Sequence, residues 1–395
     1  MISGKVAAGF EAVANALAAQ LGRPNAGGAA LCVWHRGEVV VDVWGGTRDA
    51  AGTPWTRDTV ALSFSTTKGV MATLAHRLVD SGRFDYDAPL AELWPEFGRA
   101  GKERLTLRHV LAHRAGLHGV RPLVENATQM LDWNHMTRSL AAATPRIDRR
   151  GPSAYHALTY GWLVGEVIRR ATGMSLSEAF ERELARPLEL DGAWLGCPSQ
   201  ERHRLAELLL PQPRAAATRG FSAKLAALGI RCAWALLGLD IANSSGAFLP
   251  DGIDQILRSE RLLDVELPAM NGVFTARALA RIYAMLASQG VVDGSRYLSS
   301  ETVRKASTVQ GRGLDTVLGI PMAWRLGYHL VGTTAGLLPG AFGHFGYGGS
   351  GAFADPRREL AFALTVNRVA GTPLGDGRLV KIAAAAVRAA DRRPA

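Results

Sequence analysis

Cysteine is scarce in this sequence, which has 395 residues and only three cysteines, Cys32, Cys197 and Cys232. They are odd in number and far apart, which argues against a disulfide framework and against a cysteine-ligated zinc site. So few cysteines are typical of a reducing compartment, and we expect a cytoplasmic protein.

The sequence also lacks an uninterrupted apolar run. Its most apolar stretch, residues 221–239, contains Lys224 and Arg231, and each of these charges would cost a few kcal/mol at the centre of a bilayer. We therefore expect no membrane span there, and instead a buried helix or a cap over a substrate pocket. Residues 6–21 contain Glu11 and have no basic start, which favours an amphipathic helix over a signal peptide.

Lysine is rare as well, because arginine supplies nearly all of the positive charge behind the formal net charge of +10. The basic residues are scattered, and no stretch interleaves arginine with aromatic residues. We therefore expect no nucleic-acid partner. What the chain does have is 48% hydrophobic residues, enough for a large buried core.

The order of the expected elements places a helical block between two halves of a sheet. Runs at 29–34 and 38–44 read as a hairpin, and residues 60–82 as a helix. Three further helices are expected at 106–113, 160–172 and 176–184. Four strands follow at 324–331, 341–345, 351–355 and 360–367, with a last helix at 377–391. The terminal parts are expected to share one sheet.

One short motif can make a serine reactive. Ser65 and Lys68 lie three residues apart at the start of the helix expected after Thr66. This spacing places both side chains on one face of the first turn, so the amine can reach the hydroxyl and take its proton. The N–H groups of a helix N-terminus would stabilise an oxyanion there. An isolated match of this kind would more often be a helix cap followed by a surface lysine.

Three further segments change that balance. The sequence around Ser65 resembles the nucleophile motif of the serine β-lactamase and penicillin-binding-protein superfamily, specifically the class C-like family VIII carboxylesterases. Residues 80–87, 105–117 and 155–173 resemble three other segments of that family, in the same order. Four ordered matches make the resemblance specific, and it covers most of the chain except roughly residues 200–265.

The resemblance implies that Tyr155 is the second proton carrier. A phenol keeps its proton up to about pH 10, so it acts as a base only beside a positive charge, which Lys68 would supply. Whether Lys68 or Tyr155 takes the proton of Ser65 stays open. The β-lactamases have Asn two residues after this tyrosine, whereas this chain has Ala157. His156 could face the pocket or the surface.

The third family motif, Lys-Thr-Gly, corresponds to His344-Phe345-Gly346. Gly346 would let the backbone approach the acyl group, and the N–H groups of Tyr347 and Ser65 would form the oxyanion hole. His344 replaces a permanently charged lysine and so weakens the anchor for a carboxylate. Together with Ala157, this departure favours neutral esters over β-lactams. Phe345 is a further candidate for the pocket wall.

Two other patterns do not support a site. Residues 348–352 resemble the Gly-x-Ser-x-Gly turn of an α/β-hydrolase, but no histidine follows Ser350 in the chain to act as its base. His109 and His113 are four residues apart without a glutamate or a third ligand, so we expect structural roles for them and no metal.

The sequence and its resemblance lead to one expectation with two alternatives. The fold is α/β (α+β): an antiparallel sheet flanked by helices, joined to an all-helical subdomain. The α/β subdomain spans residues 1–64 and 265–395, and the helical subdomain residues 65–264. We expect a serine hydrolase that cleaves small esters of short to medium acyl chains through an acyl-enzyme, without cofactor or metal. A β-lactamase, D-amino-acid peptidase or amide hydrolase, or a catalytically silent scaffold, are the alternatives.

Overall fold

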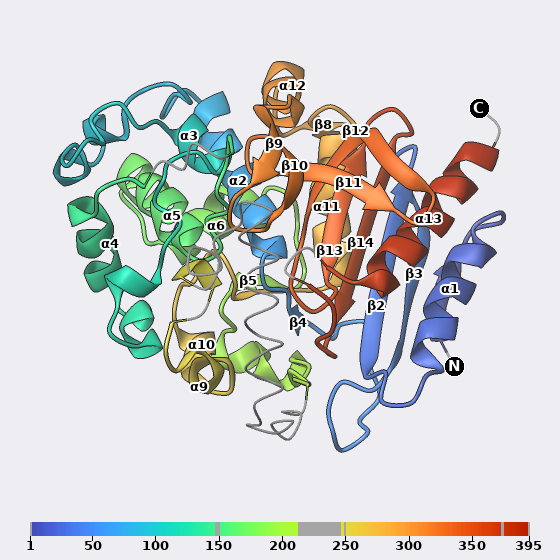
Figure 1. Ribbon diagram of the computed structural model, residues 1–395. Coiled ribbons are helices and arrows are strands. Elements are labelled where there is room, and N and C mark those ends of the chain that lie inside the picture. The colour runs from blue at the N-terminus through green and yellow to red at the C-terminus, as the bar shows by residue number, and fades with distance from the viewer. Residues whose placement is uncertain (1, 147–150, 212–245, 249, 373–374, 394–395) are drawn as a thin grey trace.

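A nine-stranded antiparallel sheet forms the centre of the fold (Figure 1). The computed structural model describes residues 2–146, 151–211, 246–248, 250–372 and 375–393. Across the sheet the strands run in the order β1 (Ile2–Val6), β3 (Glu38–Gly46), β2 (Gly28–His35), β14 (Leu360–Val366), β13 (Gly351–Asp355), β12 (Gly336–Phe345), β11 (His329–Thr333), β10 (Ile320–Trp324) and β9 (Gly311–Asp315). The N-terminal hairpin thus pairs with a strand from the end of the chain, as expected.

Helices cover both faces of this sheet. The helices α1 (Glu11–Leu21) and α13 (Gly377–Arg392) pack together on one face, and α11 (Ala276–Ala287) packs on the other against β2, β13 and β14 (Figure 1). Every residue of β13 and β14 is therefore buried, and apart from Asp355 and Thr365 these strands contain no polar side chain and do not alternate. The mixed α/β architecture confirms the expected fold class.

A block of helices lies beside the sheet (Figure 1). Its α-helices are α2 (Thr66–Asp80), α3 (Leu107–Leu111), α4 (Trp133–Ala142), α5 (Thr159–Thr172), α6 (Leu176–Phe180), α9 (Ile253–Leu257) and α10 (Arg261–Asp264), and α12 (Ser300–Ser307) packs on α2. Shorter helical turns are η1 (Leu90–Glu92), η2 (Pro95–Phe97), η3 (Arg121–Leu123), η4 (Ala127–Leu131), η5 (Glu181–Ala185) and η6 (Ser199–Arg204). The proposed division into two subdomains stays a prediction.

Two small sheets complete the described chain. One joins β4 (Ala61–Leu62), β6 (Gly272–Phe274) and β5 (Ala193–Leu195), and the other pairs β7 (Val291–Val292) with β8 (Ser295–Arg296). The first sheet matters for the site, because β4 leads directly into α2 and β6 holds it in place.

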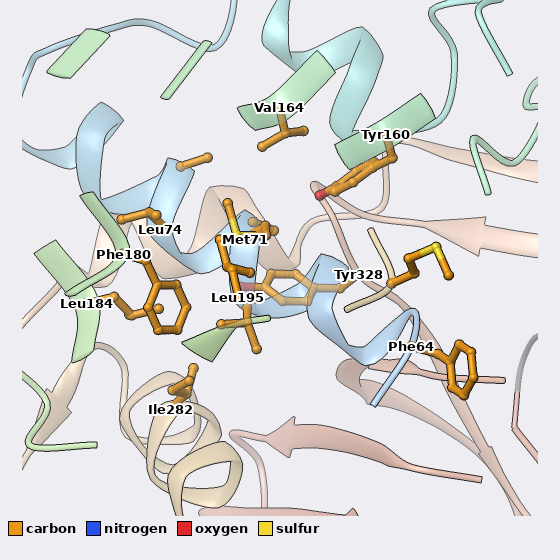
Figure 2. Packing of buried hydrophobic residues seen from close by; sticks show 14 of the residues in the cluster. Phe64, Met71, Leu74, Tyr160, Val164, Phe180, Leu184, Leu195, Ile282 and Tyr328 are labelled. Atoms are coloured by element: carbon orange, nitrogen blue, oxygen red, sulfur yellow. The ribbon is translucent and has the colours of Figure 1, made fainter. Parts of the chain in front are cut away.

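Helix α2 is the central element of the core. Twelve of its fifteen residues are buried, because α5, α11, α12 and β12 all pack on it. Figure 2 shows Met71 and Leu74 of α2 between Val164 of α5 and Ile282 of α11, with Phe180 beside Leu74. The helix ends where Gly82 adopts a positive φ of 73°, as its sequence predicts. A helix enclosed in this way can hold its side chains in fixed positions.

Four expectations differ from the structure. The helix expected at 60–82 begins only at Thr66, because Ala61–Leu62 form strand β4. The first helix begins at Glu11 instead of residue 6, because residues 2–6 form edge strand β1 on β3. The single strand expected at 324–331 is two strands, since Gly327 has a φ of 82° and allows a turn between β10 and β11. Strand β9 was not expected, because its sequence Gly-Arg-Gly-Leu-Asp lacks an apolar pattern. Residues 221–239 lie outside the described residues.

The described helices also bear on the membrane expectation. Within the part of the chain that the structure describes, no helix combines the length and the apolar character needed to cross a membrane.

Replacing Leu74 by alanine tests the central role of α2. Leu74 has no exposed surface, whereas Leu337 on β12 is 68% exposed. We expect Leu74→Ala to lower the free energy of unfolding by roughly 2–5 kcal/mol, because it leaves a cavity in a close-packed core. Leu337→Ala is the matched control and should change it by less than about 0.5 kcal/mol. Urea denaturation measures both, and equal effects would contradict the assigned packing.

Candidate active site

Ser65 sits at a constrained junction between β4 and α2. The residue before it, Phe64, has a positive φ of 45°, a conformation that costs a non-glycine residue about 1–3 kcal/mol and is frequent at functional sites. The N–H of Ser63 donates to Gly272 O on β6 (2.9 Å), which fixes the junction from the other side. Ser65 is the N-cap of α2, yet its hydroxyl makes no capping hydrogen bond. The serine is therefore not an ordinary helix cap.

The hydroxyl of Ser65 faces the amine of Lys68 instead. Lys68 Nζ lies 2.9 Å from Ser65 Oγ, 2.6 Å from Ala157 O and 3.0 Å from Ala269 O. Lys68 is fully buried, whereas Ser65 keeps partial exposure. A surface lysine is thereby excluded, and the two side chains lie together as their spacing predicts.

The surroundings of Lys68 disfavour its charged form. Its three contacts are a hydroxyl and two carbonyls, and no carboxylate of the described residues forms an ion pair with it. Burial therefore places the pKa of Lys68 well below its usual value. A neutral amine has two hydrogens, one for each carbonyl, and its lone pair is then left for the proton of Ser65. This geometry suits a base.

Tyr155 completes the group. Lys68 Nζ lies 5.1 Å from the centre of the Tyr155 ring, and the ring stacks on Trp324 at 5.4 Å between centroids with an angle of 3° between planes. The hydroxyl of Tyr155 is buried without a hydrogen-bond partner among the described residues. Burial raises the pKa of Tyr155, while the nearby Ser65 side chain lowers it. The side chain of Ser65 is thus near enough to the phenol to act as a hydrogen-bonding neighbour, although the two hydroxyls do not meet the geometry of an ordinary hydrogen bond.

The end of β12 lies against the start of α2. A Cβ atom on Gly346 would be 2.4 Å from Ser63 O, so only glycine allows this close approach. The next residue, Tyr347, packs its ring edge-on against Phe64 with centroids 5.5 Å apart. Within the described ranges, the backbone N–H groups of Ser65 and Tyr347 donate to no other residue. Two free N–H groups beside one hydroxyl suit the binding of an oxyanion.

His344 is buried on the same strand. Its Nδ1 lies 3.0 Å from Phe345 O, and because a carbonyl only accepts, we assign the ring hydrogen to Nδ1. Nε2 is then an acceptor, and it has no partner in the described chain. Burial is the largest cause that places the pKa of His344 well below its usual value. His344 is therefore neutral at neutral pH, unlike the lysine that it replaces.

The two remaining candidates are His156 and Phe345. His156 is buried and its Nε2 accepts from Leu117 N (3.1 Å), so it does not face the surface. It makes no hydrogen bond or ring contact with Ser65, Lys68 or Tyr155. Phe345 belongs to the apolar cluster under α1 and α13, because successive residues of a strand point to opposite faces. Phe345 therefore lies on the face of the strand opposite His344, whose ring lies 6.2 Å from that of Tyr155.

Two residues near Tyr155 were not recognised from the sequence as part of this site. The ring of His113 lies 4.8 Å from that of Tyr155 and 4.2 Å from that of Trp324. His113 itself lies in one of the segments that resemble the family, but only a turn was expected from it. Asp315 accepts from Tyr155 N (3.0 Å), and nothing around it in the sequence marks it. Ser350, in the segment that resembles an α/β-hydrolase turn, is buried, and its Oγ accepts from Val366 N (3.1 Å).

Comparison with known proteins identifies the family. The family model described as Beta-lactamase matches residues 13–387. The chain belongs to the β-lactamase family. The Esterase/beta-lactamase LipL of Mycobacterium tuberculosis is 43% identical over 366 residues, which are 91% of this chain and 81% of that protein. These matches confirm the resemblance seen in the sequence.

Solved structures agree over the whole chain. The crystal structure of a family VIII carboxylesterase has a TM-score of 0.86 at 33% identity and covers 98% of this chain and 100% of that chain. A penicillin-binding-protein homologue from Caulobacter crescentus has a TM-score of 0.83 at 34% identity, with the same coverage. A D-amino-acid amidase from Ochrobactrum anthropi, at 19% identity and a TM-score of 0.66, shares the fold.

The buried histidines predict instability in mild acid. Burial lowers the pKa of His76 and of His329 to about 4, and that of His156 to about 3. Below the unfolded-state pKa of about 6.5, the unfolded chain binds protons that the native chain does not. The contribution of these neutral histidines to the free energy of unfolding is therefore fully present above about pH 6.5 and is lost as the pH falls. Together, the three histidines should lower the free energy of unfolding by on the order of 6 kcal/mol by pH 5.

The slope of the free energy of unfolding against pH, between pH 6.5 and 5, measures this effect. His76→Gln should make that slope shallower, whereas His203→Gln, at an exposed histidine, should leave it unchanged. Carboxyls with lowered pKa values, such as the partly buried Asp80, titrate below this range. A slope of zero in the parent protein would contradict the neutral, buried state of these side chains.

Proposed function

We propose that this protein is a carboxylesterase that cleaves small esters through an acyl-enzyme on Ser65. The observation that carries the proposal is the buried amine of Lys68, 2.9 Å from the hydroxyl of Ser65 and without an acidic partner in the described chain. An esterase-named relative at 43% identity and a family VIII carboxylesterase neighbour support the reaction class.

In the first step, Ser65 Oγ attacks the carbonyl carbon of the ester and the proton of Ser65 moves to Lys68 Nζ. The negative charge that develops on the carbonyl oxygen is stabilised by the N–H groups of Ser65 and Tyr347. Lys68 is the better first acceptor of this proton. Burial lowers the pKa of the amine, which leaves it neutral with a free lone pair, and raises the pKa of the phenol, which keeps its own proton. The bond between the carbonyl carbon and the alcohol oxygen then breaks, Tyr155 passes a proton to the leaving alcohol, and the protonated Lys68 returns a proton to Tyr155.

In the second step, water attacks the acyl-enzyme and the same groups work in reverse. The attacking water loses a proton to the Lys68–Tyr155 pair, the bond between the acyl carbon and Ser65 Oγ breaks, and Ser65 regains its proton. The acid leaves, and the site returns to its starting state. This mechanism uses side chains and backbone groups of the chain alone.

The neutral state of His344 supports esters as the substrate class. β-Lactam substrates have a fixed carboxylate, which a charged lysine would bind and a neutral imidazole does not. The alternative deserves a test, since the name of LipL contains both activities. Short to medium acyl chains and a cytoplasmic location stay predictions. A cavity of about 810 Å³ lies beside His118, between η3 and α4, but Ser65 does not line it, so it does not set the acyl length.

A fluorophosphonate probe tests the nucleophile. We expect intact-mass analysis to show one adduct on the wild-type protein and none on Ser65→Ala, because the hydroxyl is the group that attacks. Lys68→Met should slow labelling by roughly 10³-fold, because general-base assistance is lost. The control Lys305→Met, at an exposed residue of α12, should label at the wild-type rate. An adduct that survives Ser65→Ala would overturn the proposal in favour of another nucleophile, and no adduct at all would favour a silent scaffold.

Side-by-side turnover of a nitrophenyl acyl ester and a chromogenic cephalosporin tests the substrate class. We expect kcat/KM for the ester to exceed that for the cephalosporin by about 10–100-fold. This ratio is the equivalent of one charge-assisted hydrogen bond that the cephalosporin carboxylate does not make. His344→Lys should narrow this ratio by raising the rate on the cephalosporin. Equal rates in the wild-type protein would instead make it a β-lactamase by function.

A further inference from the structure

The carboxylate of Asp315 is unusual in its setting. It is fully buried at the end of β9, the outermost strand of the sheet, next to the helical block (Figure 1). Buried carboxylates are normally paired with a cation, but every partner that the structure gives this one is a neutral N–H or O–H group. Burial of a carboxylate without a cation costs free energy, and this cost points to a role for Asp315 beyond packing.

Its two oxygens have distinct partners. Oδ1 accepts from three backbone N–H groups, those of Tyr155 (3.0 Å), Val317 (3.1 Å) and Leu318 (3.0 Å). Oδ2 accepts from the hydroxyl of Ser153 (3.0 Å) and from the indole N–H of Trp324 (3.0 Å). One side chain therefore joins the segment before α5 to the β9–β10 hairpin.

The same two connections fix Tyr155 from two directions. One bond holds its backbone, and the other holds the indole on which its ring stacks at 5.4 Å and 3°. The functional end of the phenol has no such anchor, because its hydroxyl has no partner among the described residues. Apart from the nearby Ser65 side chain, the position of that hydroxyl is therefore set from the ring and the backbone.

We infer that Asp315 is a positioning residue, which holds the phenol of Tyr155 in place for proton transfer at Ser65. The inference rests on the proposed function, in which Tyr155 moves a proton between Lys68 and the leaving alcohol. Asp315 is not itself a proton carrier, because both of its oxygens are occupied by donors and it bonds the backbone of Tyr155, not its hydroxyl. A displacement of about 1 Å at a reacting group costs roughly 10²-fold in rate, so this support matters for the reaction.

Asp315→Asn is the most direct test. An amide turned either way replaces one acceptor oxygen by a donor, so either the backbone N–H of Tyr155 or the indole N–H of Trp324 loses its bond. The measured quantity is the single-turnover acylation rate on a nitrophenyl ester, per site titrated with a fluorophosphonate, so that only folded protein counts. We expect a rate lower by roughly 10²-fold, with KM changed by less than about 3-fold.

A second background separates positioning from general damage. If Asp315 acts through the Tyr155 hydroxyl, then Asp315→Asn should slow acylation by less than about 3-fold once Tyr155→Phe has removed that hydroxyl. The matched control is Asp355→Asn. Asp355 is equally buried but bonds Arg358 at the end of β13 away from the site, and this variant should acylate within about 3-fold of wild type.

Three results would overturn the inference: an unchanged rate for Asp315→Asn, an equal loss in both backgrounds, or an equal loss for Asp355→Asn. Trp324→Phe, which keeps a ring but removes the indole N–H, extends the test if Asp315→Asn does not fold. It should slow acylation by roughly 10-fold, and an unchanged rate contradicts the inference as well. Acylation of wild-type Ser65 is measured first, so failure of the proposed function is distinguished from failure of this one.

Discussion

The contact between Lys68 and Ser65 is the interaction on which the rest of the site depends. An amine that is buried without an acid loses the hydration of its charged form, so its pKa falls well below the usual value. The loss is offset by two backbone carbonyls, Ala157 O and Ala269 O, which come from segments far apart in the chain. Helix α2, the loop before α5 and the loop before β6 must therefore be assembled together before the amine can serve Ser65. This requirement accounts for the burial of α2 on nearly all sides.

The groups around this contact share one electrostatic character. Burial lowers the pKa values of His113, His329 and His344 and raises that of Tyr155, so all four are uncharged near neutral pH. These side chains offer no positive charge for an anionic substrate to bind, but the free N–H groups of Ser65 and Tyr347 can stabilise a negative charge that develops during the reaction. The proposed preference for neutral esters and the predicted acid sensitivity of the fold thus have the same cause, which is the burial of titratable side chains without ionic partners.

The sequence predicts a contact of this site only where the two partners are close together along the chain. Ser65 and Lys68 are one helical turn apart, so their spacing alone placed them together. Tyr155 came only from the resemblance of its segment to a family. Asp315 has its partners in Tyr155, 160 residues away, and in Trp324 across the β9–β10 hairpin, whose first strand was not expected from the sequence. No local pattern reports such a contact, because a single acid in a Gly-rich strand looks like surface. Likewise, Phe345 was placed by motif position, whereas the strand alternation turns it to the opposite face.

The charge of Asp315 also bears on the choice between Lys68 and Tyr155 as the first base. After burial, the nearby Asp315 carboxylate is a further cause that raises the pKa of Tyr155. The group that holds the phenol in place therefore also opposes the formation of a phenolate. A tyrosine that served as the resting base would need the opposite environment, a lasting positive charge, and Lys68 cannot supply it while burial keeps the amine neutral. Tyr155 is then suited to relay protons without storing charge: it can donate to the leaving alcohol only as the protonated Lys68, formed in the same step, returns a proton to it.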